Sequence, residues 1–174
     1  MKDVEREIKV SIERVREEFS LLGIDDRIVE LDASSATVEL AAKALGCEPK
    51  NIAKSLAFLV GDQPILIVAS GHAKIDNAKY KHYFGKKAKM MHGDQVEKYI
   101  GHAAGGVCPF GLNEGVKVYL DDSLKTLQYV FPACGSSNSC IKLTIEELER
   151  YSHFIEWIDV CRREREKWRK KKTR

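Results

Sequence analysis

The feature that most constrains the fold is a pair of apolar, β-favouring runs separated by three residues. Residues 52–60 (IAKSLAFLV) and 64–69 (PILIVA) flank Gly61-Asp62-Gln63. Apolar runs of this length are typical of buried strands, and a short link that contains glycine favours a turn between them. The sequence therefore predicts a buried β-hairpin.

Helical patterns precede this hairpin. Apolar residues at three- and four-residue spacing predict an amphipathic helix over residues 3–22 that ends at Gly23. A second helix is expected over residues 38–45, where either Ser34 or Ser35 can cap the first turn. Polar residues at such a position can also face a ligand.

Further short elements follow the hairpin. Thr144 and Glu147 form a capping-box signature at the start of a helix. The expected helices are residues 76–84, residues 93–100, a segment from Thr144 toward Tyr151, and a last helix from about Glu156 into the C-terminal tail. The expected strands are residues 28–31, 88–91, 116–120, 129–132 and 140–143. Short strands interleaved with short helices, without a regular βαβ rhythm, predict the α+β class with a mixed sheet or a partly closed barrel.

The length and composition fit one globular domain in water. A chain of 174 residues can bury one core, and 44% hydrophobic with 32% charged residues is an ordinary globular balance. No apolar run approaches the roughly 20 residues that a membrane-spanning helix needs, and the charged first residues do not resemble an export signal. We therefore expect no membrane partner and a cytoplasmic location.

The cysteine and histidine patterns argue against disulfides and bound metal. The five cysteines are odd in number and include no CxxC pair, and the five histidines show no HxxxH or HxH spacing. No Walker or Rossmann phosphate motif occurs either. The sequence therefore predicts a reducing compartment, no metal site and no cofactor.

Positive charge is concentrated at the C-terminus. Residues 161–174 contain nine Lys or Arg and two Glu, a net charge of +7, so residues 1–160 carry −4 and the whole chain +3. A polyanion such as tRNA would be attracted to this tail, because phosphate contacts by Lys and Arg release condensed counterions. A solvated helix end without a ligand explains the same charges equally well.

Lys54 is the one charged residue inside the first strand of the predicted hairpin. An unpaired buried ammonium is costly, so Lys54 must pair with a carboxylate, reach solvent at the strand end, or face an anionic or carbonyl-bearing ligand in a cleft. Residue type alone favours solvent contact or pairing. The third alternative makes Lys54 a candidate site residue.

Two loops contain residues suited to ligand binding. The loop at residues 105–111 (GGVCPFG) combines three glycines, which allow close backbone approach, with a stiffening proline, and can direct N–H groups at a carbonyl or oxyanion. The loop at residues 135–139 (GSSNS) carries four side chains that can bind ribose hydroxyls or a phosphate. Tight turns between neighbouring elements have the same composition.

Cys108 and His102 raise the alternative of a small-molecule thiol hydrolase. A nucleophilic thiolate needs a neighbouring base or cation that lowers its pKa. Neither the residue types nor their proximity in sequence establishes a dyad, and a structural role for both is the stronger interpretation.

Four blocks occur in an order that is typical of a known family. They are residues 36–46 (ATVELAAKALG), 52–60 (IAKSLAFLV), 105–111 (GGVCPFG) and 135–143 (GSSNSCIKL). Over roughly residues 30–150 the chain resembles the YbaK family, which includes the editing domain inserted in bacterial prolyl-tRNA synthetases. Four blocks in the right order are far more specific than any one of them.

This resemblance implies a single α+β domain with a mixed, curved, partly barrel-like sheet flanked by helices, and metal-free hydrolysis of a mischarged aminoacyl-tRNA. It implies an editing domain at residues 28–152, preceded by an N-terminal amphipathic helix at residues 1–27 and followed by a C-terminal helix with a basic tail at residues 153–174. The implied partner is the aminoacylated tRNA 3′ end, with an aminoacyl-tRNA synthetase as a second candidate.

The resemblance also implies roles for individual residues. Lys54 matches the invariant active-site lysine of the family, and Gly105 and Gly106 match the loop that holds the aminoacyl group. Thr37 matches a position beside the aminoacyl pocket. The implied substrate-binding residues are Thr37, Gly105, Gly106, Val107, Cys108, Pro109, Phe110, Gly111, Gly135, Ser136, Ser137 and Asn138.

Two departures from the family pattern leave the substrate open. Cys108 replaces a serine of the cysteinyl-tRNA-deacylating branch, and Cys140 stands where some relatives have an acidic side chain. The expected activity is trans-editing deacylation of a Cys-, Ala- or Ser-type ester on proline tRNA or a similar tRNA. The alternative is a non-catalytic module that binds aminoacyl-tRNA or a synthetase, although the presence of both Lys54 and an intact glycine loop favours an enzyme.

Overall fold

The predicted hairpin forms the middle of the main sheet. The computed structural model describes residues 2–162, and within them β2 (Ile52–Val60) and β3 (Gln63–Ser70) pair antiparallel along their lengths. Their connection is the two-residue turn Gly61-Asp62, with a φ of +61° at Gly61. Glycine adopts this left-handed conformation at little cost because it has no Cβ. The hairpin prediction is confirmed.

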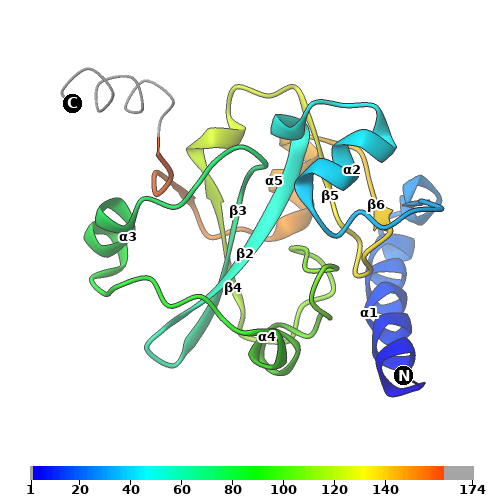
Figure 1. Cartoon of the computed structure of the whole chain (residues 1–174), viewed down its shortest axis with the longest axis horizontal. Coiled ribbons are helices and arrows are strands. Elements are labelled where there is room, and N and C mark those ends of the chain that lie inside the picture. Colours follow the sequence, from blue (N-terminus) through cyan, green and yellow to red (C-terminus); the bar gives the residue numbers. More distant parts are fainter. Residues whose placement is uncertain (1, 163–174) are drawn as a thin grey trace.

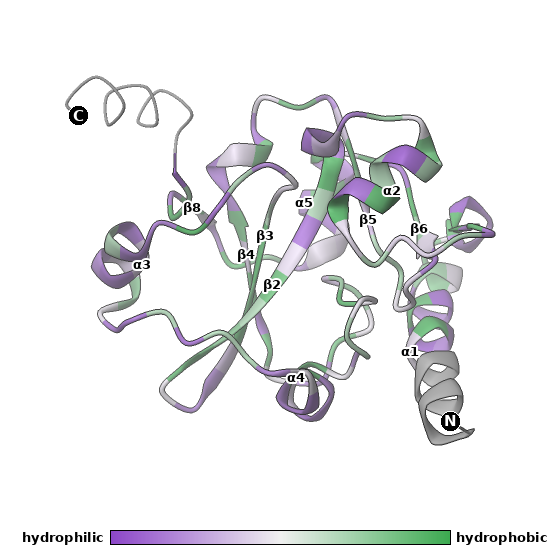
Figure 2. Ribbon diagram, viewed as in Figure 1, coloured by the Kyte–Doolittle hydropathy of each residue, from purple (hydrophilic) through white to green (hydrophobic). Residues whose placement is uncertain are grey.

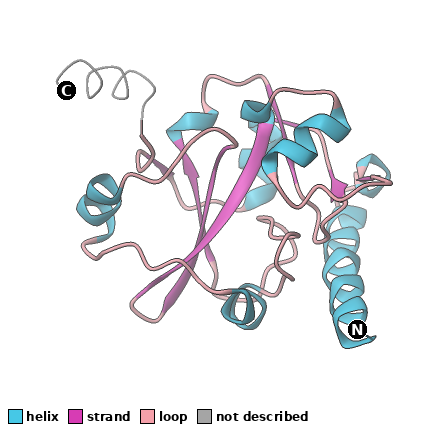
Figure 3. Ribbon diagram, in the orientation of Figure 1, coloured by secondary structure: helices cyan, strands magenta, loops and turns pink. Residues whose placement is uncertain are grey.

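Six strands form a curled half-barrel sheet in the order β7-β5-β2-β3-β4-β8 (Figure 3). The β2–β3 and β5–β7 pairs are antiparallel, whereas β2–β5, β3–β4 and β4–β8 are parallel. The four outer strands are β4 (Lys117–Asp121), β5 (Tyr129–Pro132), β7 (Leu143–Thr144) and β8 (Trp157–Ile158). A separate two-stranded sheet pairs β1 (Val29–Glu30) with β6 (Ser139–Cys140). The mixed sheet and the α+β class are therefore confirmed.

Helices surround the sheet (Figure 1). Within residues 2–162 the α-helices are α1 (Lys2–Leu21), α2 (Val38–Leu45), α3 (Asn77–Phe84), α4 (Gly93–Ile100) and α5 (Ile145–Ser152). Short 3-10 helices occur at Asp25–Arg27, Pro49–Asn51 and Asp122–Leu124. The capping box of α5 is confirmed, because Thr144 Oγ1 accepts from the Glu147 N–H and Glu147 Oε1 accepts from the Thr144 N–H, both at 3.1 Å. None of the described helices is both long and apolar enough to cross a membrane.

The two faces of the sheet bury separate cores. Successive residues of β3 alternate between them: Leu66 belongs to the cluster that includes Phe19 of α1, and Ile65 belongs to the cluster that includes Tyr80 of α3. The ring of Tyr80 packs against that of Phe58 of β2 at a tilt of 48°, with 5.1 Å between ring centroids. Figure 2 shows the apolar character of β3 and the mixed polar surface of α3. Alternating burial on both faces explains why β3 is an almost uninterrupted apolar run.

Two predicted strands differ from the structure. Residues 88–91 form only an isolated bridge, in which Met90 pairs with Phe58, rather than a strand. The predicted strand at residues 140–143 is divided between β6 and β7, which pair with β1 and β5 respectively. Both corrections concern short edge segments, where pairing with a distant strand decides the backbone conformation more than residue type does.

The predicted last helix from Glu156 is wrong where the structure describes it. Trp157 and Ile158 form β8, which runs parallel to β4, and Cys161 bridges to Ile75. We call residues 157–162 the C-terminal strap. The rest of the predicted helix and nearly all of the basic tail, residues 163–174, lie outside the described residues.

Candidate active site

A cavity of about 250 Å³ lies between α2, the start of β2 and the loop at residues 105–107. It brings together four of the predicted site residues, Lys54, Thr37, Gly105 and Val107, from three separate sequence blocks. Its polar lining consists of Ser35, Thr37, Lys54, Ser55, Ser139 and Cys140. The remainder is apolar, with side chains from α2 and β5. We call this space the small cavity.

Lys54 lies half-buried in the wall of the small cavity. Its Nζ donates to the Gly71 carbonyl at 3.4 Å and to the carbonyl of Ala73, and it forms no ion pair with any residue in the described range. Burial lowers the pKa of Lys54, and the nearby Lys74 lowers it further, whereas Cys161 acts in the opposite direction. An ammonium has three donors, so two backbone carbonyls leave one N–H for a further acceptor.

Thr37, and not Ser34 or Ser35, caps α2. Its Oγ1 accepts a hydrogen bond from the Leu40 N–H at 3.2 Å, and its backbone is extended as in other N-caps. Ser35 instead donates to the Ser137 carbonyl at 2.9 Å. The correction places Thr37 at both the start of α2 and the wall of the small cavity, where the partial positive charge of the helix N-terminus favours an electronegative group.

Glycines allow two loops and α1 to meet at their backbones. A Cβ on Gly106 would lie 2.5 Å from the carbonyl carbon of Gly135, and a Cβ on Gly135 would lie 2.7 Å from the Ser11 carbonyl oxygen in α1. Gly105, with a φ of +88°, reaches the small cavity beside the Ser137 side chain. The close approach of the predicted glycine loops therefore depends on having no side chain at Gly106 and Gly135.

Several polar groups at the small cavity have no protein partner. The Gly106 N–H donates to the Ala103 carbonyl at 3.1 Å, whereas the N–H groups of Gly105 and Val107 donate to none of residues 2–162. The Ser55 hydroxyl is buried and also lacks a partner there. The Ser55 Oγ atom has no exposed surface, so it offers no contact to a ligand in this structure. A ligand that supplied acceptors to the two N–H groups would remove the cost of those unmade bonds.

The loop at residues 135–139 is held mainly by its own side chains. Ser136 Oγ donates to Ser139 Oγ at 2.6 Å, and Asn138 Nδ2 donates to the Leu31 carbonyl at 3.1 Å. The Ser137 hydroxyl makes no hydrogen bond within the described residues. Of the four polar side chains expected to bind a ligand here, Ser136 and Asn138 order the loop, whereas Ser137 remains available beside Gly105.

Cys108 and His102 do meet, but not as a reactive pair. Cys108 Sγ lies 3.5 Å from His102 Nε2, and both side chains have 0% exposure. Burial raises the pKa of Cys108 to about 12 and lowers the pKa of His102 to about 4. Both groups are therefore neutral near neutral pH, whereas a nucleophilic pair needs a thiolate. His102 also contacts Ser11 of α1 and the Phe110 carbonyl, so it ties the loop to the helix.

The second half of the loop at residues 105–111 lies away from the small cavity. Phe110 is fully buried, with its ring centroid 4.7 Å from that of Phe19 in α1. Pro109 and Gly111 line a different groove beside α1. The expectation that the whole loop faces the aminoacyl pocket therefore needs correcting for residues 108–111, because the side chains of Cys108 and Phe110 have no surface that a ligand could touch. α1 holds this half of the loop.

No group of three or more His, Cys, Asp or Glu side chains is placed to hold a metal ion in the described part of the chain. The small cavity therefore has the chemistry of a site built from one lysine, backbone donors and small hydroxyl groups.

Comparisons with known proteins establish the family. The family model described as the aminoacyl-tRNA editing domain matches residues 32–151, and the chain belongs to this family. The uncharacterized protein YwhH of Bacillus subtilis (strain 168) is 51% identical over 154 residues, which cover 88% of this chain and 98% of YwhH. The resemblance inferred from the four sequence blocks is thereby confirmed.

More distant relatives connect the chain to prolyl-tRNA synthetases. A proline–tRNA ligase of Lactiplantibacillus plantarum (strain ATCC BAA-793 / NCIMB 8826 / WCFS1) is 24% identical over 125 residues, which cover 71% of this chain but only 22% of that enzyme. The crystal structure of a proposed trans-editing enzyme for prolyl tRNA synthetase aligns with a TM-score of 0.79 and 30% identity, over 88% of this chain and 98% of that one. The similarity therefore extends over nearly all of that solved chain but over only about a fifth of the synthetase.

Proposed function

We propose that this chain is a trans-editing deacylase, which hydrolyses the ester between a wrong amino acid and the 3′-terminal ribose of a tRNA. The observation that most directly supports this proposal is that Lys54, Thr37 and Gly105 line one cavity of about 250 Å³. Pockets for drug-sized ligands occupy about 300–1,000 Å³, so this cavity suits a small aminoacyl group. Membership of the editing family supports tRNA as the partner and the cytoplasm as the location.

In the proposed reaction a water molecule adds to the ester carbonyl carbon. The tetrahedral intermediate then expels the ribose oxygen, which takes up a proton, and the products are the free amino acid and deacylated tRNA. The N–H groups of Gly105 and Val107 are our candidates for donors to the carbonyl oxygen as it becomes negative, because neither is used elsewhere in the described structure. One such donor is typically worth about 10²–10³ in kcat.

Lys54 acts in this proposal by charge and position. Its third N–H and its positive charge orient a ribose hydroxyl or phosphate oxygen, so that the ester carbonyl lies against the loop at residues 105–107. No side chain at the small cavity is an activated nucleophile: burial raises the pKa of the Cys140 thiol to about 11, so it stays neutral near neutral pH. Holding the ester and water in a reactive geometry then supplies most of the rate.

We infer that the substrate carries a small, uncharged side chain, of the Cys, Ala or Ser type, on proline tRNA or a similar tRNA. Where some relatives are expected to have an acid, Cys140 offers no negative charge for a cationic side chain. A single contact changes discrimination between similar substrates by only a limited factor, so a panel of esters has to be compared.

The decisive experiment is a deacylation screen of the full chain against mischarged tRNAs, with Lys54→Ala in parallel. We expect selective hydrolysis by the wild type and a loss of about a hundredfold or more in the variant. The matched control is Lys117→Ala, which removes an exposed lysine at the first residue of β4. Equal activity of Lys54→Ala would refute the role of this lysine. Absence of turnover on every ester, with tRNA binding retained, would favour the non-catalytic binding module.

A further inference from the structure

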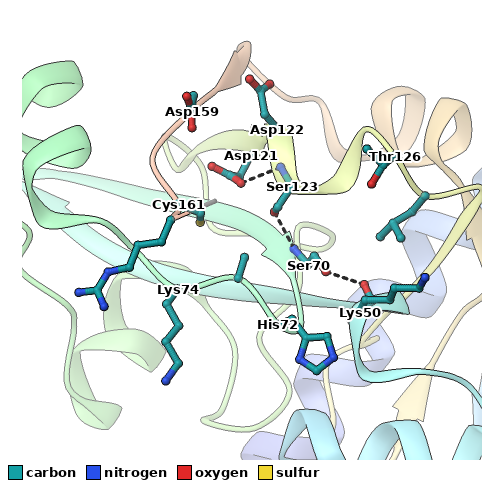
Figure 4. Close-up of a pocket in the computed structure, with 13 residues that line it drawn as sticks. Lys50, Ser70, His72, Lys74, Asp121, Asp122, Ser123, Thr126, Asp159 and Cys161 are labelled. Carbon is teal, nitrogen blue, oxygen red and sulfur yellow. Dashed lines mark hydrogen bonds between the residues drawn. The ribbon is translucent and has the colours of Figure 1, made fainter. Parts of the chain in front are cut away.

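A second and larger cavity, of about 700 Å³, lies beside the C-terminal strap at the carboxyl ends of β3 and β4 (Figure 4). Ser70 ends β3 and Asp121 ends β4, and both line this large cavity. β3, β4 and β8 run parallel, so their carboxyl ends meet at one edge of the sheet. In sheets with parallel strands this edge is the common place for a ligand.

Basic side chains line one wall of the large cavity. In Figure 4, Lys50, His72 and Lys74 lie along one side, opposite Asp122 and Thr126. The Lys50 ammonium forms an ion pair with the Glu48 carboxylate at 3.1 Å. The Lys74 ammonium pairs with no acid in the described part of the chain. Lys74 is therefore available to an anionic ligand.

The acidic side chains around the large cavity are already compensated. Asp121 is 1% exposed, and its oxygens accept hydrogen bonds from two backbone N–H groups at 2.8 and 3.0 Å. Asp122 pairs with Lys125 at 2.9 Å, although its Oδ1 accepts no hydrogen bond in the described part of the chain, and Asp159 pairs with Lys79 at 3.3 Å. These contacts reduce the repulsion that the three carboxylates would otherwise exert on a phosphate.

Lys54 connects the two cavities. Its side chain lines the small cavity, whereas its ammonium binds the carbonyl of Ala73, a residue that lines the large one. Lys74 and Asp121, which line the large cavity, shift the pKa of Lys54 in opposite directions, Lys74 downward and Asp121 upward. In aminoacyl-tRNA a single ester bond joins the amino acid to the terminal nucleotide, so the two parts must bind side by side. Two cavities on either side of the contact between Lys54 and Ala73 satisfy this condition.

We propose that the large cavity binds the 3′-terminal nucleotide of tRNA, with its phosphate toward Lys74 and Arg162 and its ribose beside Lys54. This inference rests on the proposed function, because the deacylase substrate supplies the nucleotide. The volume lies in the range of pockets for ligands of this size. The sequence that follows Arg162 contains eight further Lys or Arg and two Glu, which suits the preceding phosphates of the same RNA strand.

The test is a binding cycle that requires no turnover. The full chain and Lys74→Ala are each titrated with two RNA minihelices, one that ends in CCA and one that lacks the terminal adenosine and hence its phosphate. We expect the RNA without the terminal adenosine to bind the wild type about tenfold more weakly than the RNA that ends in CCA. For Lys74→Ala the difference between the two RNAs should be much smaller, because the substitution and the missing nucleotide remove the same contact. Lys74→Ala should also reduce the salt slope of binding by about 0.7. Lys117→Ala should behave as the wild type.

An additive cycle, in which the terminal nucleotide matters equally to the wild type and to Lys74→Ala, would overturn the inference. So would a wild type that does not distinguish the two minihelices. Thr126→Val, on the opposite wall, allows the same cycle if Lys74→Ala does not fold. Deacylation separates this inference from the proposed function: hydrolysis with an additive cycle refutes only the nucleotide site, and a coupled cycle without hydrolysis refutes only the enzyme.

Discussion

Gly106→Ala tests whether the two glycine loops and α1 form one rigid unit behind the small cavity. The added Cβ would lie 2.5 Å from the Gly135 carbonyl carbon and 2.6 Å from both the Gly135 oxygen and the Ser136 nitrogen. All three are backbone atoms, so no side chain can rotate away. Gly135 cannot retreat, because the space beyond it is filled by the Ser11 carbonyl of α1. The strain must therefore displace a loop or the helix.

The expected cost is in the upper part of the range for overpacked sites. Overpacking typically costs about 1–3 kcal/mol, and contact between rigid backbones places Gly106→Ala at about 2–3 kcal/mol. For a chain of this length 1 kcal/mol corresponds to about 2–4 °C, so the melting temperature should fall by about 4–12 °C. Gly93→Ala is the matched control, since a Cβ there meets no atom within 4 Å and Gly93 does not have a left-handed φ. Its stability should change by less than about 1 kcal/mol.

The assay is thermal unfolding of both variants, followed by deacylation at a temperature where both are folded. Displacement of the loop also moves Gly105, so we expect Gly106→Ala to lose about a hundredfold in rate, in line with a misplacement of about 1 Å. If Gly106→Ala had the same melting temperature as Gly93→Ala and hydrolysed the ester at the wild-type rate, the two loops would be able to move relative to each other. The rigid unit would then be refuted.

Two further predictions concern the pH dependence of stability and the buried thiol. The hydrogen bond from Arg27 lowers the pKa of Glu147 to about 2 from 4.5. Ionised Glu147 therefore stabilises the folded state fully above its unfolded pKa, and this stabilisation is lost as pH falls toward 2. The melting temperatures of Glu147→Gln and wild type should converge over that pH range. Cys108→Ala should keep the activity of the wild type. Iodoacetamide should modify the partly exposed Cys47 before Cys108, whose pKa is about 12. Loss of activity in proportion to modification of Cys108 would contradict this prediction.

The elements predicted correctly are those that carry a local signal. β2 is a nine-residue strand with an apolar run of the same length, and α5 begins with a capping box that involves only Thr144 and Glu147. β8 carries no such signal, because Trp157 and Ile158 are extended only through pairing with β4, about 37 residues earlier. The helix expected from about Glu156 is replaced by this pairing where the structure describes the chain, because tertiary pairing overrides the local pattern.

The same distinction applies to the site. The resemblance carried by the four sequence blocks pointed to Lys54, Thr37 and Gly105, and the structure places these three residues around one cavity. The sequence favoured a structural role for Cys108 and His102, but the contacts that bury them could not be predicted, since they depend on α1, which lies about 90 residues earlier in the chain and covers one half of the loop. A glycine-rich loop motif indicates that another group approaches the loop backbone closely, but not whether that group belongs to a ligand or to a helix of the same chain.

The C-terminal strap lies beyond residues 32–151, the range matched by the family model, yet it takes part in holding the lysine. Asp121 accepts from the Val160 N–H at 3.0 Å, the Val160 carbonyl accepts from the Asp76 N–H at 2.8 Å, and the Lys74 carbonyl accepts from the Arg162 N–H at 2.9 Å. These bonds fasten the segment at residues 71–76, whose carbonyls hold the Lys54 ammonium. The boundary near residue 152 that the resemblance implied would separate the strap from the turn that it secures. Because a lysine held by flexible carbonyls would lose its fixed position between the two cavities, residues 157–162 belong to the framework of the site.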